Sequence, residues 1–110
     1  MPDSCLKVCT RRVTAADGTS ARLVTVTGEI DADTSPALNA ALLHAVEECV
    51  LVYCDLGGIG FFGAAGANVL ASAARRAASL GHRLEVRGVR GLTEQIVRIA
   101  GLDLIVRVSG

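Results

Sequence analysis

The sequence predicts a single α/β domain in which helices pack on a mixed sheet of four to five strands, in the order β-β-α-β-α-β-α-β. Three observations predict it. Two strand-like segments, residues 5–14 and 21–30, flank a turn at Asp17-Gly18. The run VLVYCDL, residues 50–56, is almost wholly apolar, which is typical of a strand covered on both faces. Amphipathic helical segments then alternate with strands to the end of the chain.

The first thirty residues predict an antiparallel hairpin. The segment CLKVCTRRVT forms its first strand and ARLVTVTGEI its second, because both are bounded by the turn residues AADGTS. In the second strand a period of two places Val24 and Val26 on one face. The other face takes Leu23, Thr25 and Thr27.

The first helix is expected after residue 34. Ser35 is a fair N-cap, and Pro36 suits the first helical position, where its missing N–H costs nothing. Helical spacing predicts one inward face, made of Leu38, Leu42, Ala45 and Cys49. The central strand 50–56 follows this helix.

Two further helices and two strands complete the domain. A helix over 64–80 should end at Gly81 and bury Gly66, Val69, Leu70, Ala73, Ala77 and Leu80. A strand over 82–88 precedes a helix over 92–101, which should turn Leu92, Ile96 and Ile99 inward and stop at Gly101. The segment 102–108 closes as a last short strand.

Composition limits the classes of function. The chain has 110 residues, 51% apolar, with 11 basic and 11 acidic side chains, so we expect one globular domain over residues 1–110. Zero formal charge and few aromatic residues argue against nucleic-acid partners. No apolar run reaches the roughly 20 residues that span a bilayer. The N-terminus also lacks a signal-peptide segment, so we expect a cytoplasmic protein that does not insert into membranes.

The cysteines and histidines indicate neither a metal site nor an active site. The four cysteines lack paired C-x-x-C spacing, and the histidines do not complete a zinc-finger pattern. We interpret them as small, buried apolar residues of a reducing cytosol and leave a redox role open for Cys5, Cys9, Cys49 and Cys54. No nucleophile–base pair involves His44 or His82, so we expect no enzymatic activity and no cofactor.

The stretch CDLGGIGFFGAAGANVL, residues 54–70, matches the dinucleotide pattern G-x-G-x-x-G at Gly58, Gly60 and Gly63. Glu85 lies 22 residues beyond Gly63, near the expected ribose-binding position. However, the remaining chain of about 45 residues is too short for two mononucleotide halves. The bulky side chains of Phe61 and Phe62 would also crowd a pyrophosphate. We therefore reject dinucleotide binding.

The spacing of Gly58 and Gly63 also fits the P-loop pattern G-x-x-x-x-G-K-[ST]. Ala64 and Ala65 stand where the lysine and the hydroxyl residue belong. The phosphates would therefore lack the lysine that contacts them, and the magnesium ion would lack its hydroxyl ligand, so this interpretation fails.

Two longer stretches, VTGEIDADTSPAL and VYCDLGGIGFFGAAGANVLASAARRAASLGHRLEVRGV, resemble the STAS domain of anti-sigma-factor antagonists. Gly28 to Asp31 match the family's G-E-[IL]-D. The second family pattern, D-L-S-G-V-x-F-I-D-S-S-G-L followed later by G-x-x-L, is matched by Asp55, Leu56, Gly58, Ile59, Phe61, Gly66, Gly81 and Leu84. The tail LTEQIVRIAGLDLIV resembles the family's final helix and strand, so the resemblance covers nearly the whole chain.

The resemblance implies a small cytoplasmic binding protein that engages an anti-sigma factor, often a serine kinase, and thereby controls sigma-factor availability. In such relatives the kinase phosphorylates a serine of D-S-S-G at the start of the second helix. Here Gly63 replaces the aspartate, Ala64 the first serine and Ala65 the phosphoacceptor. Because alanine has no oxygen to phosphorylate, the usual switch cannot operate at Ala65.

The resemblance also locates an expected binding surface on the loop 29–34 and the segment 57–68. Its residues are Glu29, Asp31, Asp33, Thr34, Gly58, Phe62, Gly63, Ala64, Ala65, Gly66 and Asn68. The two aspartates would supply acidic contacts, and the small residues would permit close approach of a partner. Two alternatives stay open: that Asp31 and Asp33 cap the first helix, and that Phe62 belongs to the core.

Two other functions remain as alternatives. One is a STAS subunit that braces a membrane transport system or another multiprotein assembly and needs no phosphorylation. The other is a ligand-sensing STAS domain that holds a nucleotide or lipid beside Phe61 and Phe62. The sequence leaves a homodimer open.

Overall fold

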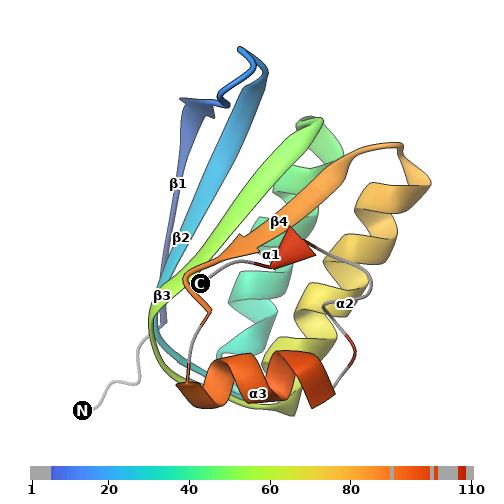
Figure 1. Ribbon diagram of the computed structural model, residues 1–110. Helices are drawn as coiled ribbons and strands as arrows, with labels where there is room; N and C mark the ends of the chain where they lie inside the picture. The colour runs from blue at the N-terminus through green and yellow to red at the C-terminus, as the bar shows by residue number, and fades with distance from the viewer. Residues whose placement is uncertain (1–5, 90, 100, 102–106, 109–110) are drawn as a thin grey trace.

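The computed structural model describes residues 6–89, 91–99, 101 and 107–108 (Figure 1). Within these ranges the elements follow the expected order. They are β1 (Leu6–Thr14), β2 (Ser20–Ile30), α1 (Ser35–Glu48), β3 (Leu51–Phe62), α2 (Ala64–Ser79), β4 (Arg83–Arg87), α3 (Gly91–Ile99) and β5 (Arg107–Val108).

The described strands form one five-stranded sheet in the order β1-β2-β3-β4-β5, with β3 in the middle. β1 and β2 are antiparallel and close at the pair Thr14 and Ser20. The turn between them is held by Asp17, whose carboxylate accepts a hydrogen bond from the Thr19 N–H at 2.9 Å. The remaining pairs, β2 with β3, β3 with β4 and β4 with β5, are parallel. The hairpin and the mixed sheet are therefore confirmed.

The helices α1 and α2 lie side by side against one face of the sheet, and α3 crosses the end of the sheet at which α2 begins (Figure 1). Val24 and Val26 are fully buried on this face, as their spacing predicts. The largest fully buried side chains of this main core include Ile30, Leu38, Leu42, Val46, Val52, Leu70, Val86 and Val97. Val97 of α3 is also buried, which the spacing of apolar residues in this helix did not predict.

The opposite face of the sheet carries a smaller apolar cluster around Ala21, Leu51 and Tyr53. The guanidinium carbon of Arg87 lies 3.6 Å from the centre of the Tyr53 ring, an arrangement that adds a cation–π attraction. Both faces of β3 are thus covered between residues 51 and 54, which agrees with its apolar sequence.

The main difference from the sequence prediction is the length of β3. We expected the strand to end near residue 56 and a glycine-rich loop to follow, but the strand continues to Phe62 and pairs with β2 as far as Ile30. Two irregularities in the register, between Thr25 and Thr27 and between Gly28 and Glu29 of β2, each place one extra residue in β3 and so bend β3 along this extension. Gly58 permits the pairing, because a Cβ there would lie 2.6 Å from the Thr27 methyl group.

Helix ends differ from the sequence prediction in smaller ways. The N-cap of α1 is Thr34, not Ser35, although Pro36 does stand in the first turn. Leu80 is the C-cap of α2 and is 38% exposed, so it does not belong to the buried stripe, and Gly81 ends the helix with φ of 73°.

Some predictions concern residues that the structure does not describe. Cys5, the side chains of Leu92 and Ile99, and the segment 102–106 lie outside the described residues, and the last strand is described at 107–108.

Candidate functional site

The ends of two neighbouring parallel strands bring the loop 29–34 and the start of α2 together. β2 leads through this loop into α1, while β3 leads through Gly63 into α2. The N–H of Gly63 donates a hydrogen bond of 3.3 Å to the carbonyl oxygen of Ile30, which joins the two strand ends. Because parallel neighbours end at the same edge of a sheet, both helices begin at this edge.

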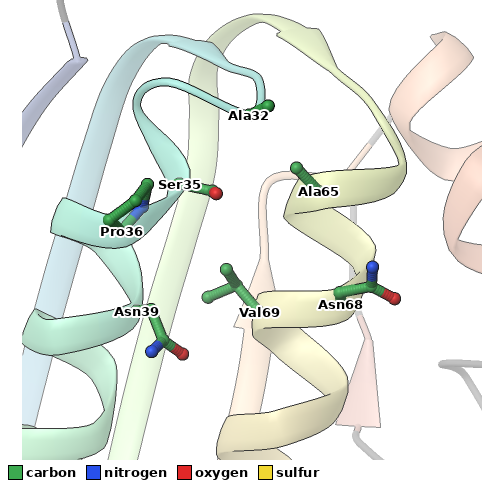
Figure 2. Close-up of a pocket in the computed structure, with 7 residues that line it drawn as sticks. All are labelled: Ala32, Ser35, Pro36, Asn39, Ala65, Asn68 and Val69. Atoms are coloured by element: carbon green, nitrogen blue, oxygen red, sulfur yellow. The ribbon is translucent and has the colours of Figure 1, made fainter.

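A groove of about 390 Å³ lies between the first turns of the two helices. Its lining residues are Ala32, Ser35, Pro36 and Asn39 from the α1 side, and Ala65, Asn68 and Val69 from α2. Figure 2 shows Ser35 and Asn39 pointing from α1 toward α2, and Val69 pointing from α2 toward α1. The groove is therefore lined by small apolar groups and uncharged polar groups.

The loop before α1 is organised by the carboxylate of Asp31. Its Oδ1 atom accepts hydrogen bonds from the N–H groups of Asp33 at 2.9 Å and Thr34 at 3.0 Å. The Thr34 hydroxyl accepts a bond of 3.0 Å from the Asp31 N–H and lies 2.8 Å from the carbonyl oxygen of Glu29. The hydrogen bonds from Thr34 hold the pKa of the Asp31 carboxyl below its ordinary value of 3.8.

These bonds separate two roles within the acidic loop. Asp31 is used to shape the turn that precedes α1, which is close to the capping role that the sequence left open. The side chains of Glu29 and Asp33 are exposed and stand beside this turn. Neither of these two side-chain carboxylates takes part in the hydrogen bonds described for the turn.

The two phenylalanines at the end of β3 have opposite environments. Phe62 is 2% exposed and belongs to the main core, so it does not lie on the expected binding surface. Phe61 is 53% exposed, and its ring packs against Gly63, where an added Cβ would approach the ring to 3.1 Å. The aromatic side chain at this surface is therefore Phe61.

The first turn of α2 has small residues and no capping side chain. Gly63 is its N-cap, no side-chain hydrogen bond is made there, and the first turn carries no acidic residue. Gly66 is buried against Phe62, while Ala64 is exposed and Ala65 is half-buried at the groove. Ala65 thus places a methyl group where the resemblance expects a hydroxyl.

The expected surface residues fall into three groups by exposure. Glu29, Asp33, Gly58, Ala64 and Asn68 are exposed, Asp31, Thr34, Gly63 and Ala65 are half-buried, and Phe62 and Gly66 are buried. The groove also uses residues that the sequence did not assign to a site, namely Ala32, Ser35, Pro36, Asn39 and Val69. Ser35 and Pro36 were recognised as helix-start residues, but their place in a groove depends on how α1 and α2 pack.

The nucleotide-like glycine pattern does not form a phosphate-binding turn. Gly58 and Gly60 lie inside β3, in extended backbone, rather than in a tight turn between strand and helix. A dinucleotide site needs that turn, since its glycines let the backbone approach the pyrophosphate.

Two further observations concern the described part of the chain. No group of three or more histidine, cysteine, aspartate or glutamate side chains there could hold a metal ion. Of the helices described, none has both the length and the apolar character needed to cross a bilayer.

Known proteins share this fold. An anti-sigma factor antagonist from Mycobacterium paratuberculosis superposes with a TM-score of 0.82 at 24% identity, over 98% of this chain and 88% of that chain. The unphosphorylated form of the anti-sigma factor antagonist SpoIIAA gives 0.71 at 10% identity, over 93% and 89%. The phosphorylated form of SpoIIAA, a Bacillus cell fate determinant, gives 0.66 at 10% identity, over 93% and 92%.

Sequence comparison gives a complementary result. A search of curated proteins finds no match to this chain. The family model described as "Mlab, STAS domain" matches residues 13–107, which is most of the chain. Together with the mixed sheet and its three helices, this match shows that the chain belongs to the STAS domain family.

Proposed function

We propose that this protein is a regulatory binding protein of the anti-sigma-factor antagonist type. It binds an anti-sigma factor, of the serine-kinase type, and so controls how much sigma factor is free. Solved structures that share its fold include anti-sigma factor antagonists, which supports the antagonist part of the proposal. The binding surface consists of the loop 29–34, the groove between α1 and α2, and the exposed ring of Phe61.

The position of Ala65 is the observation that carries the proposal. It lines the groove at the first turn of α2, next to the acidic loop, where an incoming partner would contact both helices. A phosphate at a helix N-terminus is tolerated by the helix dipole, yet it changes the charge of a docking surface by nearly two units. In SpoIIAA a phosphorylated form exists. In this chain Ala65 has no oxygen to accept the phosphate, so binding persists in the presence of the kinase and ATP.

The surface also suits docking of a helix or loop from a partner. The groove has no charged lining residue, whereas Glu29 and Asp33 beside it are exposed and acidic. An apolar or small polar segment can enter the groove, and basic groups next to that segment can meet the two carboxylates. Charged groups at the rim guide association more than they add affinity.

Binding to purified anti-sigma factors from the same genome tests the proposal. Surface plasmon resonance should show a complex with one of them, with equal affinity before and after incubation with ATP. The variant Ala65→Glu should weaken this complex, while Arg75→Glu, on the exposed side of α2, should leave it unchanged. If none of these anti-sigma factors binds, the proposal is wrong.

The missing hydroxyl also favours a second candidate function. A STAS subunit that braces a membrane transport system, or another stable multiprotein assembly, has no need for a phosphorylation switch. Co-purification from the native source distinguishes the two. A stable complex with a transport ATPase and no anti-sigma factor would favour this second function.

A further inference from the structure

A second cavity, of about 330 Å³, lies at the end of the sheet opposite to the groove. Its lining comes from β1, the start of β2, the C-terminal end of α1 and the chain before β3. The start of β2 and the end of α1 lie on the upper side of the molecule in Figure 1. Its lining residues are Arg12, Ser20, Ala21, Arg22, Glu48, Cys49 and Val50. Its volume is at the lower end of the range of small-molecule pockets.

Two arginines stand side by side in this cavity. Arg12 of β1 and Arg22 of β2 are direct partners in the antiparallel register, so both point to the same face of the sheet. Side chains in this relation have Cβ atoms about 5 Å apart, and two like charges placed there repel each other. Arg11, the preceding residue of β1, faces the other side.

No acidic side chain among the described residues neutralises this pair. Glu48 is the acidic group in the lining, but its carboxylate lies 3.5 Å from His44 Nε2 and is about half exposed. Glu47, its neighbour, pairs with Arg76 at 3.0 Å. Two guanidinium groups against one carboxylate leave the cavity lining with a net positive charge.

Arg22 also has a buried donor that the described residues do not satisfy. Its Nε atom is inaccessible to water and has no hydrogen-bond partner among them. Buried polar groups are almost always paired, and an exception calls for an explanation such as an ion. The cross-strand pairing of the two arginines is the observation at the cavity itself, and the Arg22 Nε atom beneath its surface lacks a partner among the described residues.

We propose that this cavity binds the phosphate group of a small molecule. A single phosphate dianion neutralises both guanidinium groups, which bind oxyanions through paired N–H donors. The hydroxyl of Ser20 supplies a further donor in the lining. Val50, which is 56% exposed, provides an apolar wall for an organic part of the ligand. The site is separate from the groove and does not depend on the function proposed for it.

NMR titration of the full chain with inorganic phosphate and with glycerol 3-phosphate, at constant ionic strength set with sodium chloride, tests the site. We expect amide shifts at Ser20, Arg22 and Cys49, and none at Ala65. Arg12→Gln and Arg22→Gln should each raise the dissociation constant at least tenfold. Arg11→Gln is the matched control, since it removes the same charge from the opposite face of the same strand, and it should leave the constant unchanged.

The two probes distinguish free phosphate from a phosphate carried by a larger molecule. Equal affinity for both probes supports a site for the phosphate group alone, whereas tighter binding of glycerol 3-phosphate supports an organic ligand that contacts Val50. The proposal is overturned if neither probe shifts these amides in the unmodified protein. It is also overturned if Arg11→Gln weakens binding as much as Arg12→Gln, because general charge would then explain the effect.

Discussion

The ring of Phe62 lies directly against Gly66: a Cβ added at position 66 would come within 2.7 Å of Phe62 Cε1 and within 3.1 Å of Ile30 Cγ2. Phe62 ends β3, and Gly66 lies in the first turn of α2. The absence of a side chain at Gly66 therefore sets how closely the start of α2 approaches the sheet. This distance in turn fixes the position of Ala65 at the groove.

Gly66→Ala should destabilise the protein, although the intrinsic helix propensity of alanine is more favourable than that of glycine by about 1 kcal/mol. Phe62 is 2% exposed, so the added methyl group would have to displace its ring within the core, and overpacking of this kind costs about 1–3 kcal/mol. Urea denaturation would measure the loss as a lower midpoint of unfolding.

Two variants serve as controls for that measurement. Asn68→Ala, an exposed change in the same helix, should alter the free energy of unfolding by less than about 0.5 kcal/mol. In the double variant with Phe62→Leu, the cost of Gly66→Ala should fall, because the two side chains no longer collide. A Gly66→Ala protein as stable as the parent would contradict the contact.

Ala65→Ser should create a phosphoacceptor. With a partner kinase and ATP, mass spectrometry should find phosphate on Ser at position 65 in the variant and none on this segment in the parent, since residues 57–70 contain no serine, threonine or tyrosine. Phosphorylation should then weaken the complex at least about tenfold, which corresponds to about 1.4 kcal/mol.

Ala64→Ser is the matched control for that change. Its hydroxyl would lie one residue earlier, on an exposed position outside the groove, and should be a poor substrate. Phosphate found on Ser35 of the parent protein would contradict the absence of a switch, because Ser35 lines the same groove.

The loop before α1 should lose its order in acid. Folding lowers the pKa of Asp31, so its carboxylate stabilises the folded state at pH values above the ordinary pKa of 3.8. This contribution disappears as the pH falls through the lowered pKa of the folded state. The amide resonances of Asp33 and Thr34 should therefore shift with a midpoint below 3.8.

Asp31→Asn should abolish that transition at Thr34, and Asp33→Asn, which changes an exposed side chain, should leave it in place. A midpoint at or above 3.8 would show that the hydrogen bonds to Asp31 do not persist in solution.

Cys54 should be inert to thiol reagents in the native protein, while Cys9 reacts. Burial, followed by the negative charge of Asp55, raises the pKa of the Cys54 thiol from 9.0 to about 12, whereas Cys9 is exposed on β1. Alkylation at pH 8 followed by mass spectrometry should label Cys9 and spare Cys54, and in urea both should be labelled.

The same shift has a consequence for stability. Above pH 9.0 the thiol of the unfolded chain ionises and that of the folded chain does not, so the folded state should lose stability as the pH rises further. Cys54→Ala should reduce this loss. Rapid labelling of Cys54 in the native protein would contradict its burial in β3.

The hairpin and the helices could be predicted because their signals are local. Val24 and Val26 alternate with polar residues, Pro36 marks a helix start and Gly81 a helix end, and each of these preferences acts within a few residues. The end of β3 could not be predicted in this way. Its glycines have low intrinsic strand preference, and they are extended because β2 supplies hydrogen-bonding partners as far as Ile30.

The expected binding surface came from the resemblance to the STAS domain, which assigned the loop 29–34 and the segment 57–68 to it. The structure brings this loop and the start of α2 together at the ends of β2 and β3. The sequence could not tell which of Phe61 and Phe62 faces solvent, because their alternation depends on the register of the extended strand. Nor could it find Asn39 and Val69, which meet only when α1 packs against α2.

The sequence by itself determined the order of elements, the helix-start and turn residues, and the lack of a hydroxyl at Ala65, because each follows from the identity of residues close together in the chain. Only the tertiary structure decided that β3 reaches Phe62, that Phe61 is exposed, that Asp31 shapes its own loop, and that Arg12 and Arg22 are neighbours on one face of the sheet. These features depend on pairing between distant segments, and the energy of such pairing is not contained in any one segment.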